Sequence, residues 1–168
     1  GITLLSVGSK VVARIVAGRL QVWSSTWSNP LQFGFTKGSG VDDVQQLTRA
    51  FLEDAAGSAH DRIFVFRFFD LEKAYPRVAR HGLWTLLTKK GCPAGFLKVL
   101  KALHNHTASA VRFQGHLSSS FVPDRGLREG CPSSPILFNL YHAGILEVFR
   151  ARRARAATAA ALTPGITW

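Results

Sequence analysis

Apolar residues recur along most of this chain at intervals of three and four, the spacing that puts side chains on one face of an α-helix. The spacing predicts five helices, over about 6–23, 39–51, 76–90, 93–103 and 135–149, the last continuing into an alanine-rich stretch. The positions that carry it are Val7, Val11 and Ile15 with Val12, Val16 and Leu20; Val41, Val44, Leu47 and Phe51; Leu83, Leu86 and Leu87; Phe96, Leu97, Leu100 and Leu103; and Leu137, Leu140, Ile145 and Phe149.

Two stretches have the pattern of strands instead. Ile63 to Phe69 is apolar and aromatic except for Arg67, which predicts a strand buried on both faces. Residues 109–114 alternate, Gly115-His116 provides a turn, and residues 117–122 return, which predicts a β-hairpin. Strands separated by helices predict a mixed α/β (α+β) fold.

Two acidic residues open the second predicted helix. Ser39 and Asp42 have capping-box spacing, and Asp42 with Asp43 suits the positive end of the helix dipole. Paired acids can also serve catalysis, but helix capping is the preferred interpretation of this pair.

Charge indicates the kind of partner. The 168 residues carry 21 Lys and Arg against 10 Asp and Glu, a net charge of +11, and 46% of them are hydrophobic, as in a globular chain. The excess lies after residue 60, where sixteen basic residues face six acidic ones. This balance favours nucleic acid as the partner, ahead of an anionic membrane or a merely solvated basic surface.

Cysteines and histidines do not predict a structural metal or disulfide framework. Cys92 and Cys131 are far apart, and the six histidines lack metal-ligand spacing. A reducing compartment, nuclear or cytoplasmic, is the expectation. No transmembrane segment or signal peptide is predicted, and no membrane partner is expected.

Asp70 is the first candidate for chemistry, because it directly follows the predicted strand 63–69. Ligands and reactive groups gather at the carboxyl ends of strands in α/β folds. A carboxylate there must be hydrogen-bonded, paired or metal-bound. Taken alone, Asp70 is better explained as a helix cap or as the partner of Lys73 in an ion pair, and only further motifs favour a chemical role.

Two segments together carry a family resemblance. The stretches 68–75 (Phe-Phe-Asp-Leu-Glu-Lys-Ala-Tyr) and 126–141 (Gly-Leu-Arg-Glu-Gly-Cys-Pro-Ser-Ser-Pro onward) resemble motifs A and B of reverse transcriptases of the non-LTR (LINE-like) retrotransposon type. Gln32-Phe-Gly-Phe35 with Gly38 and Asp43 is similar to that family's fingers segment, and 4–6 and 17–20 are similar to its helix entry.

The resemblance implies a partial right-hand polymerase fold. Residues 1–60 would form fingers helices, and residues 61–168 would form the first part of an incomplete ferredoxin-like palm, with motif A at 66–76 and motif B at 126–141. Its activity would be RNA-directed DNA synthesis with an RNA template, a DNA primer and dNTP. The family's reaction uses two Mg²⁺ ions, with Mn²⁺ as a substitute.

Site residues follow from the same resemblance. Asp70 would bind both metal ions, with the backbone carbonyl of Leu71 as a further ligand. Tyr75 would be the steric gate under the incoming sugar, or else ordinary core packing. The remaining candidates are nucleotide contacts at Glu129 and Gly130 and template or primer contacts at Lys73, Arg128, Ser134 and Pro135.

The sequence departs from the family at three points. Glu129 stands where motif B usually has Gln, and an ionised carboxylate repels a triphosphate. Pro76 replaces an acid. The aromatic-x-Asp-Asp hairpin of motif C is absent, so we expect a fragment that is inactive alone, depends on the remainder of its own polypeptide and self-associates through exposed apolar surface. The alternatives are a non-catalytic nucleic-acid-binding relic and a maturase-like RNA-binding domain.

Overall fold

A computed structural model describes residues 4–26, 29–57, 65–105 and 108–162, with the side chains of the last helix as far as residue 156. The elements are, in chain order, α1 (Val7–Ser24), α2 (Val41–Gly57), α3 (Arg80–Lys89), α4 (Ala94–His104), β1 (Arg112–Phe113), β2 (His116–Leu117) and α5 (Ser134–Leu162).

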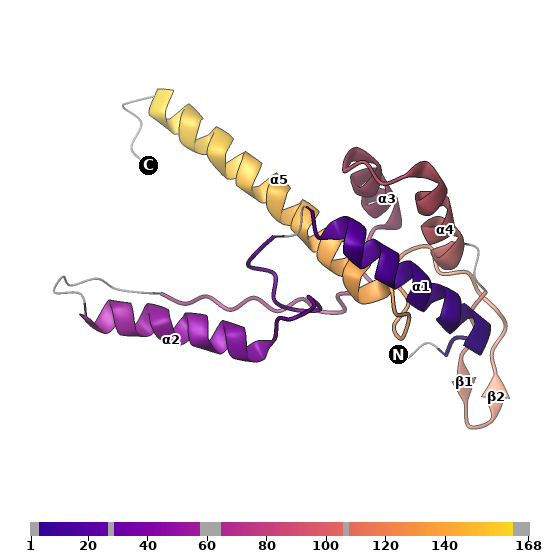
Figure 1. Ribbon diagram of the computed structural model, residues 1–168. Coiled ribbons are helices and arrows are strands. Elements are labelled where there is room, and N and C mark those ends of the chain that lie inside the picture. The colour runs from indigo at the N-terminus through magenta and orange to yellow at the C-terminus, as the bar shows by residue number, and fades with distance from the viewer. Residues whose placement is uncertain (1–3, 27–28, 58–64, 106–107, 163–168) are drawn as a thin grey trace.

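The core lies where α1, α3 and α4 gather around the first half of α5 (Figure 1). The faces predicted for α3 and α4 point into this core. On α1 the prediction is wrong for four of six positions, because Val7, Val11, Val12 and Ile15 are exposed and the buried face is formed by Ala13, Val16, Ala17 and Leu20. Fully buried leucines come from all four helices: Leu20, Leu83, Leu87, Leu100 and Leu137. Cys92 and Cys131 are buried free thiols, and burial raises the pKa of the Cys92 thiol.

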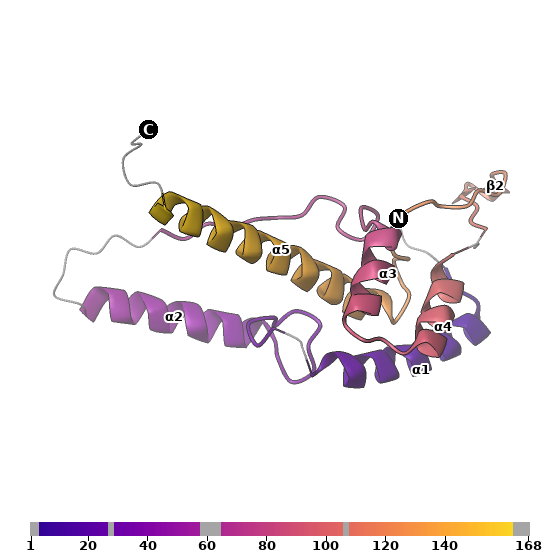
Figure 2. The same ribbon diagram turned by 90° about the horizontal axis from the view of Figure 1, so that it is seen from above.

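Two parts of the molecule stand away from this core (Figures 1 and 2). The second half of α5 projects beyond α3, and α2 runs apart from α1, α3 and α4 in both views. None of the residues of α2 is buried, so its predicted apolar face is exposed to solvent. In the described part of the chain no helix, α5 included, is both long and apolar enough to cross a membrane.

One of the two acids caps α2, as the preferred interpretation predicts, but the bond joins Gly40 and Asp43 instead of the predicted Ser39 and Asp42. The carboxylate of Asp43 accepts the backbone N–H of Gly40 at 2.6 Å, so it satisfies a donor at the start of α2. At the start of α1, Ser6 accepts the N–H of Ser9 at 3.3 Å. Asp43 therefore has a structural role.

The strand predicted over residues 63–69 is wrong for the described positions. Residues 65–70 form no regular element, and all are exposed; residues 63 and 64 lie outside the described part. A strand needs hydrogen-bond partners on a neighbouring strand. Within the described ranges, β1 and β2 pair with each other, and no strand lies beside residues 65–70. This apolar run therefore has the composition of a strand, but the described part of the chain gives it no neighbouring strand to pair with.

The helix predicted from Pro76 begins at Arg80 instead. Residues 72–77 form turns, in which Lys73 has a φ of +52° and its carbonyl accepts the N–H of Arg77 at 3.1 Å. Ala79, directly before α3, has an extended backbone (φ −75°, ψ 100°), so helical geometry starts only after it. The turns therefore separate Pro76 from α3.

The hairpin is confirmed, with its turn one residue earlier than predicted. Arg112 pairs with Leu117 and Phe113 with His116, leaving Gln114 and Gly115 as the two turn residues. Their φ values of +47° and +83° are those that a two-residue type I′ turn requires at both positions.

Candidate active site

Backbone hydrogen bonds join the motif A segment to the motif B loop. The N–H of Leu127 donates to the carbonyl of Tyr75, and the N–H of Gly126 donates to the carbonyl of Val78, both at 2.9 Å. The rings of Tyr75 and Phe138 add a tilted contact, with centroids 5.3 Å apart. Segments some fifty residues apart in the sequence are thus held against each other at fixed register.

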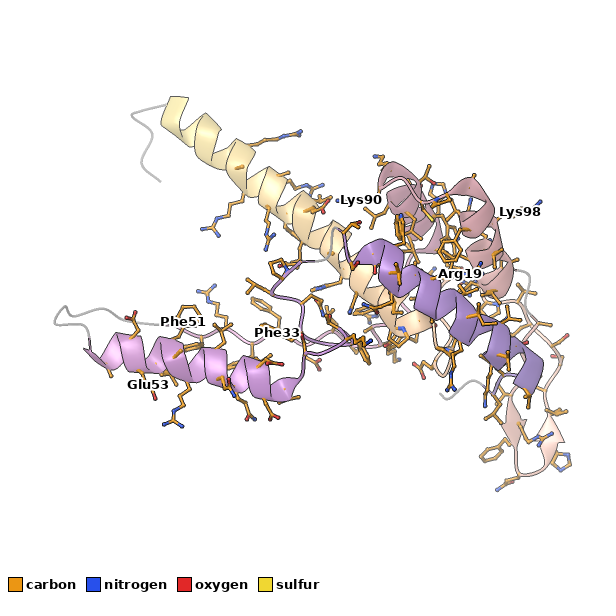
Figure 3. The ribbon with its side chains drawn as sticks, viewed as in Figure 1. Arg19, Phe33, Phe51, Glu53, Lys90 and Lys98 are labelled. Carbon is orange, nitrogen blue, oxygen red and sulfur yellow. The ribbon has the colours of Figure 1, made fainter. Side chains whose placement is uncertain are left out.

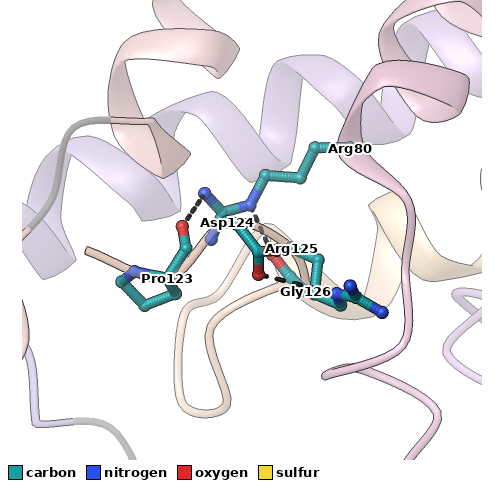
Figure 4. Close-up of polar contacts among 5 residues, drawn as sticks. All are labelled: Arg80, Pro123, Asp124, Arg125 and Gly126. Atoms are coloured by element: carbon teal, nitrogen blue, oxygen red, sulfur yellow. Dashed lines mark hydrogen bonds and ion pairs between the residues drawn. The ribbon is translucent and has the colours of Figure 1, made fainter. Parts of the chain in front are cut away.

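Arg80 also holds this junction together through side-chain hydrogen bonds (Figure 4). Its Nε donates to the carbonyl of Gly126 at 2.7 Å, and a terminal nitrogen donates to the carbonyl of Pro123 at 3.0 Å. Burial lowers the pKa of Arg80, and Arg128 adds to the shift while Asp124 opposes it. A planar cationic donor fits two neighbouring carbonyl acceptors.

Sequence reasoning missed Arg80, although a signal was present. Arg80 precedes Leu83, Trp84 and Leu87 by three, four and seven residues, so it lies on the buried face of α3. A cation on the apolar face of a helix must have acceptors nearby, because an unpaired buried charge is costly.

Replacing Arg80 by Met should destabilise the chain by about 2–4 kcal/mol, because two carbonyl acceptors lose a charged donor in a buried setting. Arg80→Lys should recover only part of this loss, since an ammonium lacks the planar fork that reaches both carbonyls. Urea unfolding followed by circular dichroism measures both. A matched control is Arg77→Met, whose exposed pair with Glu72 should contribute less than about 1 kcal/mol. Equal losses at positions 77 and 80 would contradict this role for Arg80.

Asp70 and Leu71 lie on a groove of about 500 Å³ beside the middle of α5. Phe138, Tyr141 and His142 form part of the opposite wall. Asp70 is exposed; its Oδ1 accepts the N–H of Leu71 at 2.9 Å, and it forms no ion pair within the described residues.

The oxygen donors at this groove are of the type that Mg²⁺ prefers, a carboxylate and a backbone carbonyl. The described residues nevertheless contain no group of three or more His, Cys, Asp or Glu that could hold a metal ion. Glu72, on the same groove, pairs with Arg77 at 2.8 Å. The donor chemistry fits one part of a magnesium site, supplied by Asp70.

Tyr75 is half-buried against the core rather than projecting freely. Burial raises the pKa of its phenol, and the negative charge of Glu129 adds to the shift. Its hydroxyl therefore stays protonated at neutral pH. The contact with Phe138 is the packing that the alternative interpretation predicts, and a gate role remains a prediction.

Arg128 and Glu129 line a second hollow of about 500 Å³, together with Pro76 and Arg80. Both side chains are partly exposed. Gly130 follows with a φ of +94° and is exposed, so the chain turns sharply here in a conformation that L side chains rarely adopt. The structure thus separates Asp70 and Leu71, on one groove, from the motif B loop, on the other, with Tyr75 between them.

Helix α5 begins at Ser134, as predicted for motif B. The Ser134 side chain is buried, and its oxygen has no hydrogen-bond partner within the described chain. Pro135 is half-buried in the first turn, where its missing N–H costs nothing. Lys73 is exposed in the turn after Asp70.

Asn139 is a second residue that sequence reasoning missed. Its side-chain nitrogen donates to the carbonyl of Gly34 at 2.7 Å, and its oxygen accepts from Gln32 at 3.4 Å. These bonds attach the fingers-like loop to the motif B helix. The signal was an amide within one turn of the buried Leu137 and Leu140, which needs polar partners.

Comparison with known proteins gives the family. Residues 1–160 match the model of the reverse transcriptase (RNA-dependent DNA polymerase) family. The chain is 30% identical over 139 residues to a retrovirus-related Pol polyprotein from the type-2 retrotransposable element R2DM of Drosophila melanogaster, covering 83% of this chain and 13% of the relative.

Two further Drosophila melanogaster relatives are probable RNA-directed DNA polymerases, from transposon BS (31% identical over 147 residues, 86% of this chain and 16% of the relative) and from transposon X-element (30% over 142 residues, 83% and 15%). The chain spans about a sixth or less of the length of these relatives. With motifs A and B in contact and a family match over nearly all its length, this chain belongs to the reverse transcriptases of the non-LTR, LINE-like retrotransposon type.

Proposed function

We propose that this chain is part of an RNA-directed DNA polymerase of a LINE-like retroelement. The observation that carries the proposal is the backbone pairing of the Tyr75 segment with the Leu127 loop, which puts two family motifs on adjoining hollows. Residues 1–60 act as fingers, and residues 61–168 act as the first part of a ferredoxin-like palm. Residues 65–70 then need partner strands from the remainder of the polypeptide.

Asp70 holds magnesium in this proposal, with the carbonyl of Leu71 as a second oxygen donor. Bound divalent ions supply charge neutralisation for phosphoryl transfer from an incoming dNTP. Tyr75 limits the space beneath the sugar, and Gly130 admits the nucleotide close to the backbone. Lys73, Arg128 and Pro135 at the start of α5 face the template and primer, whereas the Ser134 side chain is buried and takes no part in this contact.

An RNA template paired with a DNA primer forms an A-form-like duplex, which proteins grip through phosphates and shape. The net charge of +11 suits that partner. Binding of a hybrid duplex should therefore weaken steeply with salt. Fluorescence anisotropy across a salt series tests this: Arg128→Gln should lower the slope of log affinity against log salt by about one. A slope near zero for the wild-type chain would overturn the proposal.

We expect no DNA synthesis by the 168 residues alone, because the chain lacks the second carboxylate motif. Primer extension with Mg²⁺ or Mn²⁺ measures this, and any template-dependent product that Asp70→Asn abolishes would contradict the expectation. Hybrid binding by Asp70→Asn should match wild type, which separates loss of chemistry from loss of binding.

A second candidate is a non-catalytic nucleic-acid-binding relic, or a maturase-like RNA-binding domain. Glu129 favours it, since its negative charge lies close enough to raise the pKa of Tyr75 and would oppose a triphosphate. Glu129→Gln should tighten dNTP binding if the polymerase proposal holds. Unchanged dNTP binding together with firm hybrid binding would favour the relic.

A further inference from the structure

An open groove of about 450 Å³ lies between α3 and α5. Its floor is apolar: Leu86 comes from α3, and Tyr141, Ile145, Val148 and Phe149 come from α5. Val148 and Phe149 are 53% and 62% exposed, so the floor is open to solvent at this end of the groove. Such a surface favours an apolar occupant of helical width.

The rim of the groove is basic. His81 and Lys89 line it from α3, and Arg152 lines it from α5. No acidic residue is among those that line it within the described chain. An occupant with acidic side chains beside its apolar face would complement this rim.

Helix α2 has that chemistry. It carries four acidic residues, Asp42, Asp43, Glu53 and Asp54, and one basic residue, Arg49, so its net charge is −3 in a chain of net charge +11. Its apolar face is exposed throughout: Val41, Val44, Leu47, Phe51 and Leu52.

The acids of α2 are arranged for such a contact. At 100° per residue, Asp43 and Asp54 border the apolar face along one edge. Phe51 and Glu53 project from opposite sides of the helix (Figure 3). A helix lying with Phe51 in an apolar groove would therefore place Asp43 and Asp54 near the rim and keep Glu53 in solvent.

We propose that α2 of one copy docks in the α3–α5 groove of a second copy of this chain. The chain's own α2 is directed elsewhere, because the loop before it is bonded through Gly34 to Asn139. Asn139 lies on the face of α5 opposite Ile145 and Val148. Exchange in both directions buries two helices of about 25 Å each and closes a two-fold dimer.

Sedimentation velocity on the 168-residue chain tests the proposal. Wild type should form dimers that weaken at high salt. Leu47→Asp, which damages α2, and Phe149→Asp, which damages the groove, should each give monomers with unchanged helix content, since both side chains are partly or largely exposed. A mixture of the two variants retains one intact α2 and one intact groove. It should form a 1:1 heterodimer, held by one contact and at least tenfold weaker than wild type.

Phe68→Asp is the matched control, because Phe68 is 91% exposed and belongs to neither surface. It should dimerise like wild type. The proposal is overturned if wild type is monomeric, which would leave α2 free or on its own groove. It is equally overturned if Phe68→Asp abolishes association, or if the mixed variants stay monomeric. Phe149 also lines the Asp70 groove, but sedimentation is measured without nucleic acid, so a failure of dimerisation is distinguishable from a failure of hybrid binding.

Discussion

Gly126→Ala should destabilise the core by roughly 3 kcal/mol or more and loosen the junction between the two motifs. Gly126 has a φ of +85°, where an L residue costs about 1–2 kcal/mol. A Cβ there would also lie 2.9 Å from both the Cα and the carbonyl oxygen of Pro76. Backbone atoms cannot swing aside as a side chain does, and the bonds from Gly126 to Val78 and Arg80 hold the loop in place.

Gly91→Ala separates the conformational cost of a positive φ from the steric cost of the contact with Pro76. Gly91 has a similar φ of +79° but open space around its missing Cβ. Its substitution should therefore cost only the conformational part, about 1–2 kcal/mol. Chemical unfolding of both variants under the same conditions measures the difference. If Gly126→Ala is no worse than Gly91→Ala, the close approach to Pro76 has no energetic weight.

His104 should make the fold sensitive to acid. Its ring is fully buried at the end of α4, 6.1 Å from the ring of Trp84, and neither nitrogen has a hydrogen-bond partner within the described chain. Burial lowers the pKa of His104 from 6.5 to about 4, and the positive charges of Arg80 and Arg128 add to the shift. The folded protein thus keeps this imidazole neutral where an unfolded chain would protonate it.

The sign follows from proton binding. Between pH 6.5 and about 4, His104 is protonated in the unfolded state but stays neutral in the folded state. The free energy of unfolding therefore falls as the pH is lowered through this range. The full loss is about 3 kcal/mol, reached near pH 4. Above pH 6.5 this contribution is constant.

Stability measured from pH 7.5 to 4 in wild type and His104→Leu checks the prediction. The leucine variant should lack this part of the slope, because it removes the titrating ring and keeps an apolar side chain of similar size. His116→Gln, at an exposed strand position, should retain the wild-type slope. Parallel curves for wild type and His104→Leu would show that another group is responsible.

Local patterns predicted the elements whose partners are close in the sequence. Helical spacing identified the core faces of α3 and α4, since Leu83, Leu87 and Leu100 are buried where the period puts them. The turn of the hairpin was located to within one residue. The motifs identified the family without any coordinates.

Elements that depend on distant partners were not predictable in this way. The run 65–69 has strand composition, yet hydrogen-bond partners decide whether such a run pairs. Arg80 and Asn139 were missed because their acceptors, the carbonyls of Gly126 and Gly34, are distant in the sequence. The roles of Asp70, Tyr75 and Glu129 stay predictions, since they depend on ligands.

The bonds from Gly126 and Leu127 to the Val78 and Tyr75 carbonyls involve main-chain atoms alone. A side-chain substitution at Tyr75 removes the ring contact with Phe138 but none of these main-chain donors and acceptors. The two donor amides also give the connection its own signal. Their exchange with deuterated solvent should be slow and should report each opening of the junction, whether or not nucleic acid is bound.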